Sequence, residues 1–249
     1  MALTHLFDLN AREVVAIIGC GGKTTLMNHL AHSYPNQRVL LTTSTKIWPP
    51  ACDSYDHWLT PLSVPLDFQG CRGVSVLGAL TPTSNGLKLA QAPTLHQYLP
   101  YFDKVFIEAD GSKGKPLKAW SMQEPVILPE TSCTIGVLPA ISLGLTLNPN
   151  NVHRFSKLLA WGGFHPGQLV TPAVLARIIS HPQGLFAKAR GRRVLVLTHV
   201  ANVTTLNQMN EVIAQLPEKM KQQLDRIVAV DFLEERGRVL WQNHISVTR

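Results

Sequence analysis

A short segment near the N-terminus combines residue types that bind phosphate groups. Glycines let successive backbone N–H groups turn toward an anion, and a neighbouring lysine adds a mobile positive charge. We expect Lys23 to reach the β- and γ-phosphates of a nucleoside triphosphate and to act in catalysis, and the Thr24 hydroxyl to ligate Mg²⁺. The residues predicted to bind this cofactor are Gly19, Cys20, Gly21, Gly22, Lys23, Thr24 and Thr25.

The flanking sequence predicts the strand–loop–helix context that a phosphate loop requires. Residues 13–18 (EVVAII) are apolar and β-branched, as in a buried strand, and residues 24–32 place apolar side chains on one helical face. A standard phosphate loop has glycine six residues before its lysine. Here Ile17 stands at that position, and Gly19 lies four residues before Lys23 instead. The alternative is a glycine-rich turn that binds nothing, but a lysine after two glycines has no packing purpose.

Two carboxylates follow one face of a second apolar segment. Residues 104–109 (KVFIEA) read as a buried strand, whose period of two places Glu108 and Asp110 on the same side. An acid in such a strand is costly without a partner, which favours a functional role over a solvated strand end. We expect Asp110 to hold the metal and Glu108 to orient a nucleophile as a general base. Lys113 and Lys118, in the loop that follows, are candidate contacts for phosphate or an anionic substrate.

Strands separated by helical segments predict an α/β fold, with a P-loop NTPase-like, mostly parallel sheet that carries helices on both faces. The length suits a single P-loop α/β domain over 1–249, with a helical subdomain around 140–190. Prolines and weak periodicity predict an irregular stretch over 48–70. Further strands are predicted at 38–43, 74–80, 134–138, 193–197, 227–230 and 239–241, and helices at 151–161, 172–180 and 206–224, the last interrupted at Pro217.

The composition of the chain indicates where the protein is located and what kinds of partner it binds. No apolar run is long enough to span a bilayer, and the N-terminus lacks a signal-peptide pattern, so we expect no membrane association. The four cysteines lie far apart without a Cys-x-x-Cys pair, which is typical of a reducing cytoplasm. The net charge of +7 comes from 23 basic and 16 acidic residues, and the basic residues are mostly dispersed. Anionic small molecules or an acidic protein partner are therefore favoured over nucleic acid.

The predicted strand at 193–197 ends where GTPases usually carry Asn-Lys-x-Asp. This chain continues with residues 198–202 (THVAN), and Ala201 stands at the aspartate position that would bind guanine. Guanine selectivity by that mechanism is therefore not expected. We predict ATP, or another nucleoside triphosphate, together with Mg²⁺ as the cofactors.

These segments together resemble the selenium-dependent molybdenum hydroxylase accessory protein family, called YqeC, over most of the chain. The phosphate loop by itself is also similar to the shorter Gly-Thr-Asn-Gly-Lys-Thr-Thr loop of the Mur ligases. The family resemblance implies a pathway more firmly than a reaction, with a molybdenum hydroxylase or its cofactor-maturation proteins as partners. The matching segments are GCGGKTT at 19–25, TTSTKI at 42–47, EADGSKGKPLKAW at 108–120, VHR at 152–154 and LVTP at 169–172.

The function predicted from these features is a cytoplasmic NTPase that hydrolyses or uses ATP during maturation of a selenium-dependent molybdenum hydroxylase. One alternative is an ATP-dependent ligase or small-molecule kinase, because of the Mur-like loop. Another is a nucleotide-gated chaperone or adaptor with little turnover.

Overall fold

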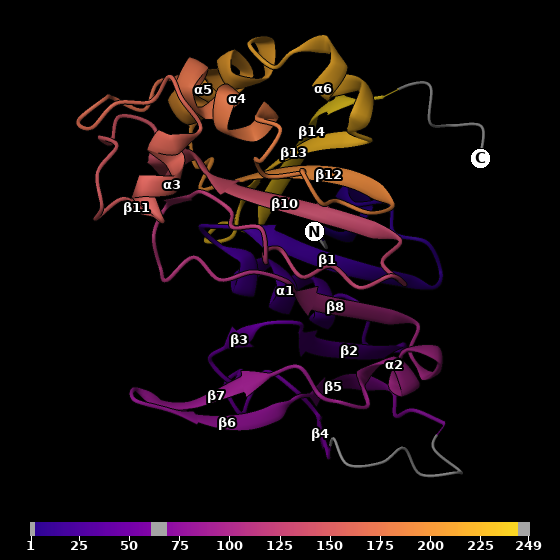
Figure 1. Cartoon of the computed structure of the whole chain (residues 1–249). Helices are drawn as coiled ribbons and strands as arrows, with labels where there is room; N and C mark the ends of the chain where they lie inside the picture. The colour runs from indigo at the N-terminus through magenta and orange to yellow at the C-terminus, as the bar shows by residue number, and fades with distance from the viewer. Residues whose placement is uncertain (1–2, 61–68, 244–249) are drawn as a thin grey trace.

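A nine-stranded sheet forms the centre of the computed structural model, which describes residues 3–60 and 69–243 (Figure 1). Neighbouring strands are parallel, apart from the antiparallel edge strand β14. The predicted α/β class with a mostly parallel sheet is therefore confirmed. In spatial order the strands are β14 (Arg236–Gln242), β13 (Arg226–Asp231), β12 (Arg192–Thr198), β10 (Cys133–Pro139), β1 (Glu13–Gly19), β8 (Lys104–Glu108), β2 (Arg38–Thr43), β5 (Gly73–Leu77) and β4 (His57–Leu59).

Helices cover both faces of this sheet, as the alternation of side chains along β1 demonstrates. Val15 and Ile17 pack in one hydrophobic cluster with Leu26 of α1, whereas Ala16 and Ile18 pack in another that contains residues of α4 and α5. Burial on both faces explains why the central strands are continuously apolar. The helices of the described chain are η1 (Leu3–Leu6), α1 (Lys23–His32), α2 (Leu95–Tyr98), η2 (Leu99–Tyr101), η3 (Ala140–Ser142), α3 (Phe155–Ala160), α4 (Pro172–Ser180), α5 (Val203–Ala214) and α6 (Glu218–Gln223).

Two small sheets flank the central one. Strands β3 (Lys46–Ile47), β7 (Gly86–Ala90) and β6 (Ala79–Thr83) form an antiparallel sheet that projects beyond β2 and β5 (Figure 1). Strand β9 (Leu117–Lys118) pairs in parallel with β11 (Val152–His153) and joins the segment after β8 to the chain before α3. No helix in the described ranges is both long and apolar enough to cross a bilayer.

Most predicted elements are present, and the exceptions have local causes. The helix predicted at 151–161 is wrong in its first turn, because residues 152–153 form β11 and Arg154 has a left-handed φ of 58°. The strand predicted at 74–80 divides into β5 and the start of β6. The stretch predicted to be irregular at 48–70 contains β4, and its residues 61–68 lie outside the described part. The helix predicted at 206–224 begins earlier, at Val203, and breaks before Pro217 as expected.

Parallel strands bring their carboxyl ends to one edge of the sheet, which is where ligands bind in open α/β sheets. β1 ends at Gly19, β8 at Glu108 and β12 at Thr198, so the predicted phosphate loop and both acids meet at this edge. Residues 140–190, predicted as a helical subdomain, contain η3, β11, α3 and α4. That they form a separate subdomain within one domain stays a prediction.

Gly19 is the position at which the turn out of β1 depends most on glycine. Its φ is 103°, and a Cβ there would lie 2.1 Å from the Val137 carbonyl oxygen in the neighbouring strand β10. A backbone oxygen held in the sheet has no room to move. We expect Gly19→Ala to lower the free energy of unfolding by about 3 kcal/mol, from the left-handed conformation and the overlap together. Chemical denaturation measures this.

Gly111 provides the matched control for Gly19. It lies in the loop after β8, where a Cβ would meet no heavy atom within 4 Å beyond its chain neighbours, and its φ is not left-handed. Gly111→Ala should therefore change stability little. Equal losses in the two variants would contradict the role given to Gly19.

Candidate functional site

The loop between β1 and α1 presents a row of backbone N–H groups without partners. Gly19, Gly21 and Gly22 all have left-handed φ values, 103°, 70° and 108°, so the chain turns tightly before α1 begins at Lys23. No side chain caps the helix, and Leu26 is the first residue whose N–H bonds back into the loop, to Gly22. The N–H groups of residues 21–25 have no acceptor among the described residues. Such an array, at the positive end of a helix, suits an anion.

Lys23 is the first residue of α1, and its side chain is 5% exposed. Its Nζ donates a 2.8 Å hydrogen bond to the Gly19 carbonyl and lies 3.4 Å from Asp110 Oδ1 and 3.7 Å from Glu108 Oε1. Burial disfavours the charged ammonium, but the charges of Asp110 and Glu108 outweigh it and raise the pKa of Lys23. Lys23 is therefore a charged group held directly beneath the loop.

Glu108 stands between the loop and the neighbouring strand β2. The Thr24 hydroxyl donates to Glu108 Oε2 at 3.1 Å, which places a hydroxyl and a carboxylate oxygen together beside the loop. Oxygens of these kinds are the donors that Mg²⁺ prefers, so the pair fits that ion. Burial raises the pKa of Glu108, Lys23 opposes the shift, and the Asp110 charge adds to it.

Asp110 lies deeper and is fully buried. Its carboxylate accepts hydrogen bonds from the Gly19 N–H at 3.0 Å, from Lys118 Nζ at 3.0 Å and from Trp120 Nε1 at 2.7 Å. It therefore joins the end of β1 to the segment after β8. This one side chain thus connects β1, β9 and, through its ion pair with Lys23, the start of α1.

Glu124 extends the hydrogen-bond network of Asp110 toward the surface. Glu124 Oε2 lies 3.3 Å from Lys118 Nζ and accepts a 2.6 Å hydrogen bond from Arg154 Nη1. Lys118 is itself fully buried and also donates to the Gly111 carbonyl at 2.6 Å. Lys118, predicted as a phosphate contact, thus has three protein acceptors of its own.

The structure brings all the predicted site residues together around the loop. Cys20 is buried, its Sγ donates to the Pro116 carbonyl at 3.0 Å, and burial raises the pKa of its thiol to about 12. This thiol thus contacts the segment after β8, and its predicted part in binding the cofactor stays a prediction. Asp110 as metal ligand and Glu108 as base stay predictions, although the contact with Thr24 favours Glu108 as the metal-side acid.

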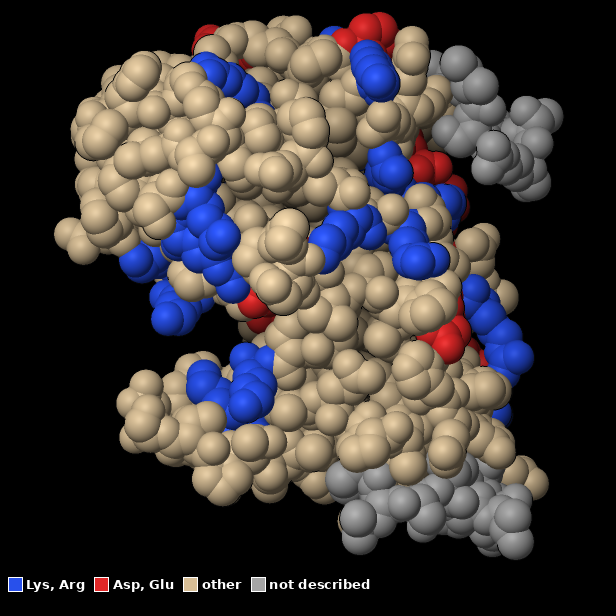
Figure 2. Space-filling view, viewed as in Figure 1, with Lys and Arg blue, Asp and Glu red and all other residues tan. Residues whose placement is uncertain are grey.

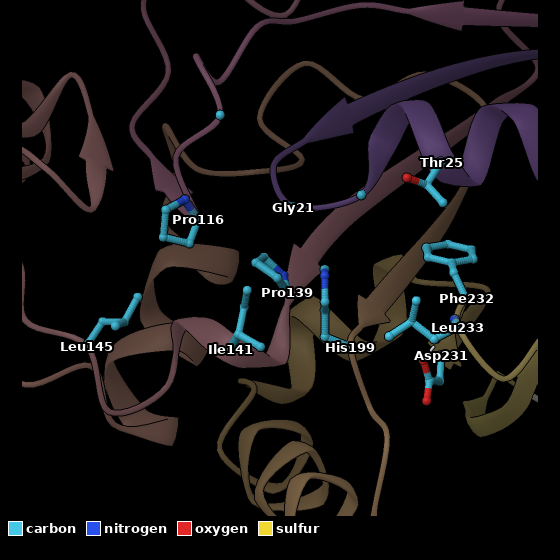
Figure 3. Close-up of a pocket in the computed structure, with 12 residues that line it drawn as sticks. Gly21, Thr25, Pro116, Pro139, Ile141, Leu145, His199, Asp231, Phe232 and Leu233 are labelled. Atoms are coloured by element: carbon cyan, nitrogen blue, oxygen red, sulfur yellow. Dashed lines mark hydrogen bonds between the residues drawn. The ribbon is translucent and has the colours of Figure 1, made fainter.

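A cavity of about 570 Å³ opens beside the loop and contains residues that the sequence analysis did not single out (Figure 3). Figure 3 shows Pro139, Ile141 and His199 facing the loop at Gly21, with Phe232 next to Thr25. Pro139 ends β10 and Ile141 lies in η3 just after it, whereas His199 and Phe232 directly follow β12 and β13. Their position after predicted strands was the available signal, since the carboxyl ends of parallel strands share one edge. The lining residues are Gly21, Gly22, Thr25, Gly114, Pro116, Pro139, Ile141, Leu145, His199, Asp231, Phe232 and Leu233.

The cavity and the loop are joined by direct contacts. Thr198 donates its hydroxyl to the Gly21 carbonyl at 2.6 Å, and its Oγ1 lies 3.0 Å from His199 Nδ1. His199 has a left-handed φ of 60°, a strained conformation of the kind that collects at functional sites. The Phe232 ring stacks on His29 of α1 at a centroid distance of 5.1 Å.

Comparison with known proteins agrees with the family resemblance of the sequence. A family model described as "YqeC protein" matches residues 15–156, which include the loop, both acids and Arg154. A protein of Escherichia coli (strain K12) named YqeC is 32% identical over 201 residues, which cover 73% of this chain and 74% of that protein. No solved structure matches the chain.

Neutralising Asp110 and neutralising Glu108 should have opposite effects on the stability of the protein. Asp110→Asn removes the charge that faces buried Lys118 and Lys23, so we expect the free energy of unfolding to fall by about 3–5 kcal/mol. Glu108→Gln should instead raise the melting temperature at pH 7.5. The folded-state pKa of Glu108 is raised, so ionisation of Glu108 costs stability as pH rises through that value, and glutamine cannot ionise.

The pH dependence provides the internal control for Glu108. Below the ordinary glutamate pKa of 4.5 the carboxyl is protonated in both folded and unfolded chains, so the gain from Glu108→Gln should shrink as pH falls toward that value. Melting curves between pH 4.5 and 7.5 measure it. A constant difference between wild type and variant would refute the electrostatic explanation.

Proposed function

The chain belongs to the YqeC family, and we propose that it binds a nucleoside triphosphate, ATP, together with Mg²⁺ on the loop at residues 19–25. The observation that carries this proposal is the run of backbone N–H groups at 21–25 that find no acceptor in the described chain. The first N–H groups of a helix have no partner within the helix, and here the left-handed glycines before α1 add two more, so the row offers several donors to one anionic ligand.

The surrounding charges suit a polyphosphate. Lys23 remains protonated beneath the loop and can turn from the Gly19 carbonyl to a phosphate oxygen. Thr24 and Glu108 would hold Mg²⁺ from the side of β8. When bound, the ion would offset the negative charge of the β- and γ-phosphates. Glu108 would then lie beside the terminal phosphate, where a carboxylate can orient the group that attacks it.

The nucleoside would occupy the cavity beside the loop. Its position supports this, because the cavity begins at Gly21 and Thr25, where a bound phosphate chain would end. Ile141, His199 and Phe232 offer apolar and ring surfaces against which a base can pack. Asp231, at the end of β13, lines the same cavity and is a hydrogen-bond acceptor for base or ribose.

The proposed role of this activity is based on the family resemblance rather than on the site. We propose that the protein acts in the maturation of a selenium-dependent molybdenum hydroxylase in the cytoplasm, with that enzyme or its cofactor-maturation proteins as partners. ATP hydrolysis or phosphoryl transfer is the proposed chemistry. A nucleotide-gated adaptor is the second candidate, and slow turnover that rises when the hydroxylase is added would favour it.

Binding of Mg–ATP tests the proposal directly. Lys23→Ala removes the ammonium that lies beneath the loop at the start of α1, and we expect the affinity for Mg–ATP to fall by about 100-fold, the loss of a charge-assisted contact with phosphate. Isothermal titration calorimetry measures this. Lys219→Ala, at an exposed position on α6, is the control and should bind like wild type. Equal affinities in wild type and Lys23→Ala would refute the proposal.

The nucleoside position can be tested with tripolyphosphate, which has the phosphates of ATP and no nucleoside. Phe232→Ala should weaken ATP binding by about tenfold, since one aromatic contact is lost, and leave tripolyphosphate binding unchanged. Lys23→Ala should weaken both ligands. Competition titrations against a fluorescent nucleotide measure the two affinities. If Phe232→Ala weakens both ligands equally, the cavity does not hold the nucleoside.

A further inference from the structure

A second hollow lies beside the small antiparallel sheet (Figure 2). Figure 2 shows it between the part of the molecule that carries β6 and β7 and the part that carries β11 and the loop after β8. Lysine and arginine side chains gather on both walls, with acidic side chains at the back. The proposed function does not use this hollow.

Lys88 and Trp48 form the wall that belongs to the small antiparallel sheet. Lys88, in β7, holds its Nζ 3.2 Å above the centroid of the Trp48 ring, which is 56% exposed. The ring fixes the ammonium by a cation–π contact without neutralising it. Partial desolvation lowers the pKa of Lys88, and the negative charge of Glu108 opposes this shift, so Lys88 lies within electrostatic reach of that carboxylate.

Lys113 and Arg154 belong to the opposite wall, and both are conformationally strained. Their φ values are 53° and 58°, in the left-handed region that non-glycine residues adopt uncommonly. Arg154 is oriented by its hydrogen bond to Glu124. The ring of His153 next to it stays neutral, because burial and the charges of Arg154, Lys118 and Lys113 lower its pKa to about 4. Positive charge is thus concentrated on this wall.

In the described part of the chain, the acidic side chains near the hollow all have basic partners, but two of the lysines have no acidic partner. Asp110 and Glu124 are engaged with Lys118 and Arg154, and Glu108 with Lys23 and Thr24. Neither Lys88 nor Lys113 has an ion pair with any residue in the described ranges. Lys88, held over the Trp48 ring, and Lys113, exposed in the loop after β8, therefore remain available for an anion.

We propose that this hollow binds a second substrate, a small molecule with a carboxylate or phosphate group held between Lys88 and Lys113. The proposal rests on the proposed function, because it places the anion next to Glu108, where the terminal phosphate of a bound nucleotide would lie. A dedicated anion site there favours transfer to, or activation of, an acidic metabolite over simple hydrolysis. The Trp48 ring beneath Lys88 adds an apolar surface for the body of that molecule.

The test uses the full chain saturated with Mg²⁺ and a non-hydrolysable ATP analogue, so that the phosphate loop is filled. Inorganic phosphate and malonate are then titrated separately at low ionic strength, with tryptophan fluorescence and calorimetry as readouts. We expect saturable binding of at least one of them, which distinguishes a phosphate from a carboxylate ligand. Lys88→Ala and Lys113→Ala should each weaken it about tenfold, and Lys88→Arg should retain it. Lys219→Ala should have no effect.

The outcomes separate this inference from the function on which it rests. Failure of the analogue to bind wild type overturns the nucleotide proposal itself. If the analogue binds normally, two results would overturn the second site alone. One is that neither anion binds saturably, and the other is that both lysine variants bind the anion like wild type. Lys88→Ala must also bind the analogue normally, because Lys88 lies outside the phosphate loop.

Discussion

The site depends on one buried carboxylate. Asp110 accepts hydrogen bonds from the Gly19 N–H, Lys118 and Trp120, and it faces Lys23, so it joins the end of β1, the start of α1 and the segment after β8. A carboxylate in the interior is stable only when donors of this number surround it. The fixed geometry of the loop follows, because Gly19 cannot move while its N–H is held between two carboxylate oxygens.

This arrangement divides the work between two acids that are two residues apart. Asp110 binds protein groups. Glu108 is the last residue of β8 and accepts a hydrogen bond from Thr24 at the edge of the sheet where the strands end. Burial raises the pKa of Glu108, so its ionisation is costly in the folded chain. Since β8 ends at Glu108, Asp110 lies beyond the strand, and its greater depth follows from its hydrogen bonds to Gly19, Lys118 and Trp120 rather than from strand alternation.

Local patterns predicted the parts of the fold that are locally determined. The apolar runs of β1 and β8, the turn to α1 and the Thr171 cap of α4 all depend on residues close in sequence, and they are present. The start of α3 was wrong because β11 pairs with β9, some thirty-five residues earlier, and no local pattern records that pairing. The cavity was missed for the same reason: Ile141, His199 and Phe232 meet only because β10, β12 and β13 are neighbours in the sheet.

The balance of charge explains why the proposed nucleotide would need a divalent ion. Lys23 lies 3.4 Å from Asp110 and 3.7 Å from Glu108; Asp110 is also paired with Lys118, whereas Glu108 has only Lys23 among the ion pairs of the described residues, so little of the Lys23 charge is left for a triphosphate. An approaching polyphosphate would meet repulsion from Glu108 unless a cation stood between them. The free N–H groups at 21–25 attract the phosphates but carry only partial charge. Under the proposed function, Glu108 thus discriminates against a bare triphosphate, and the Thr24 hydroxyl beside it marks where the required cation would sit.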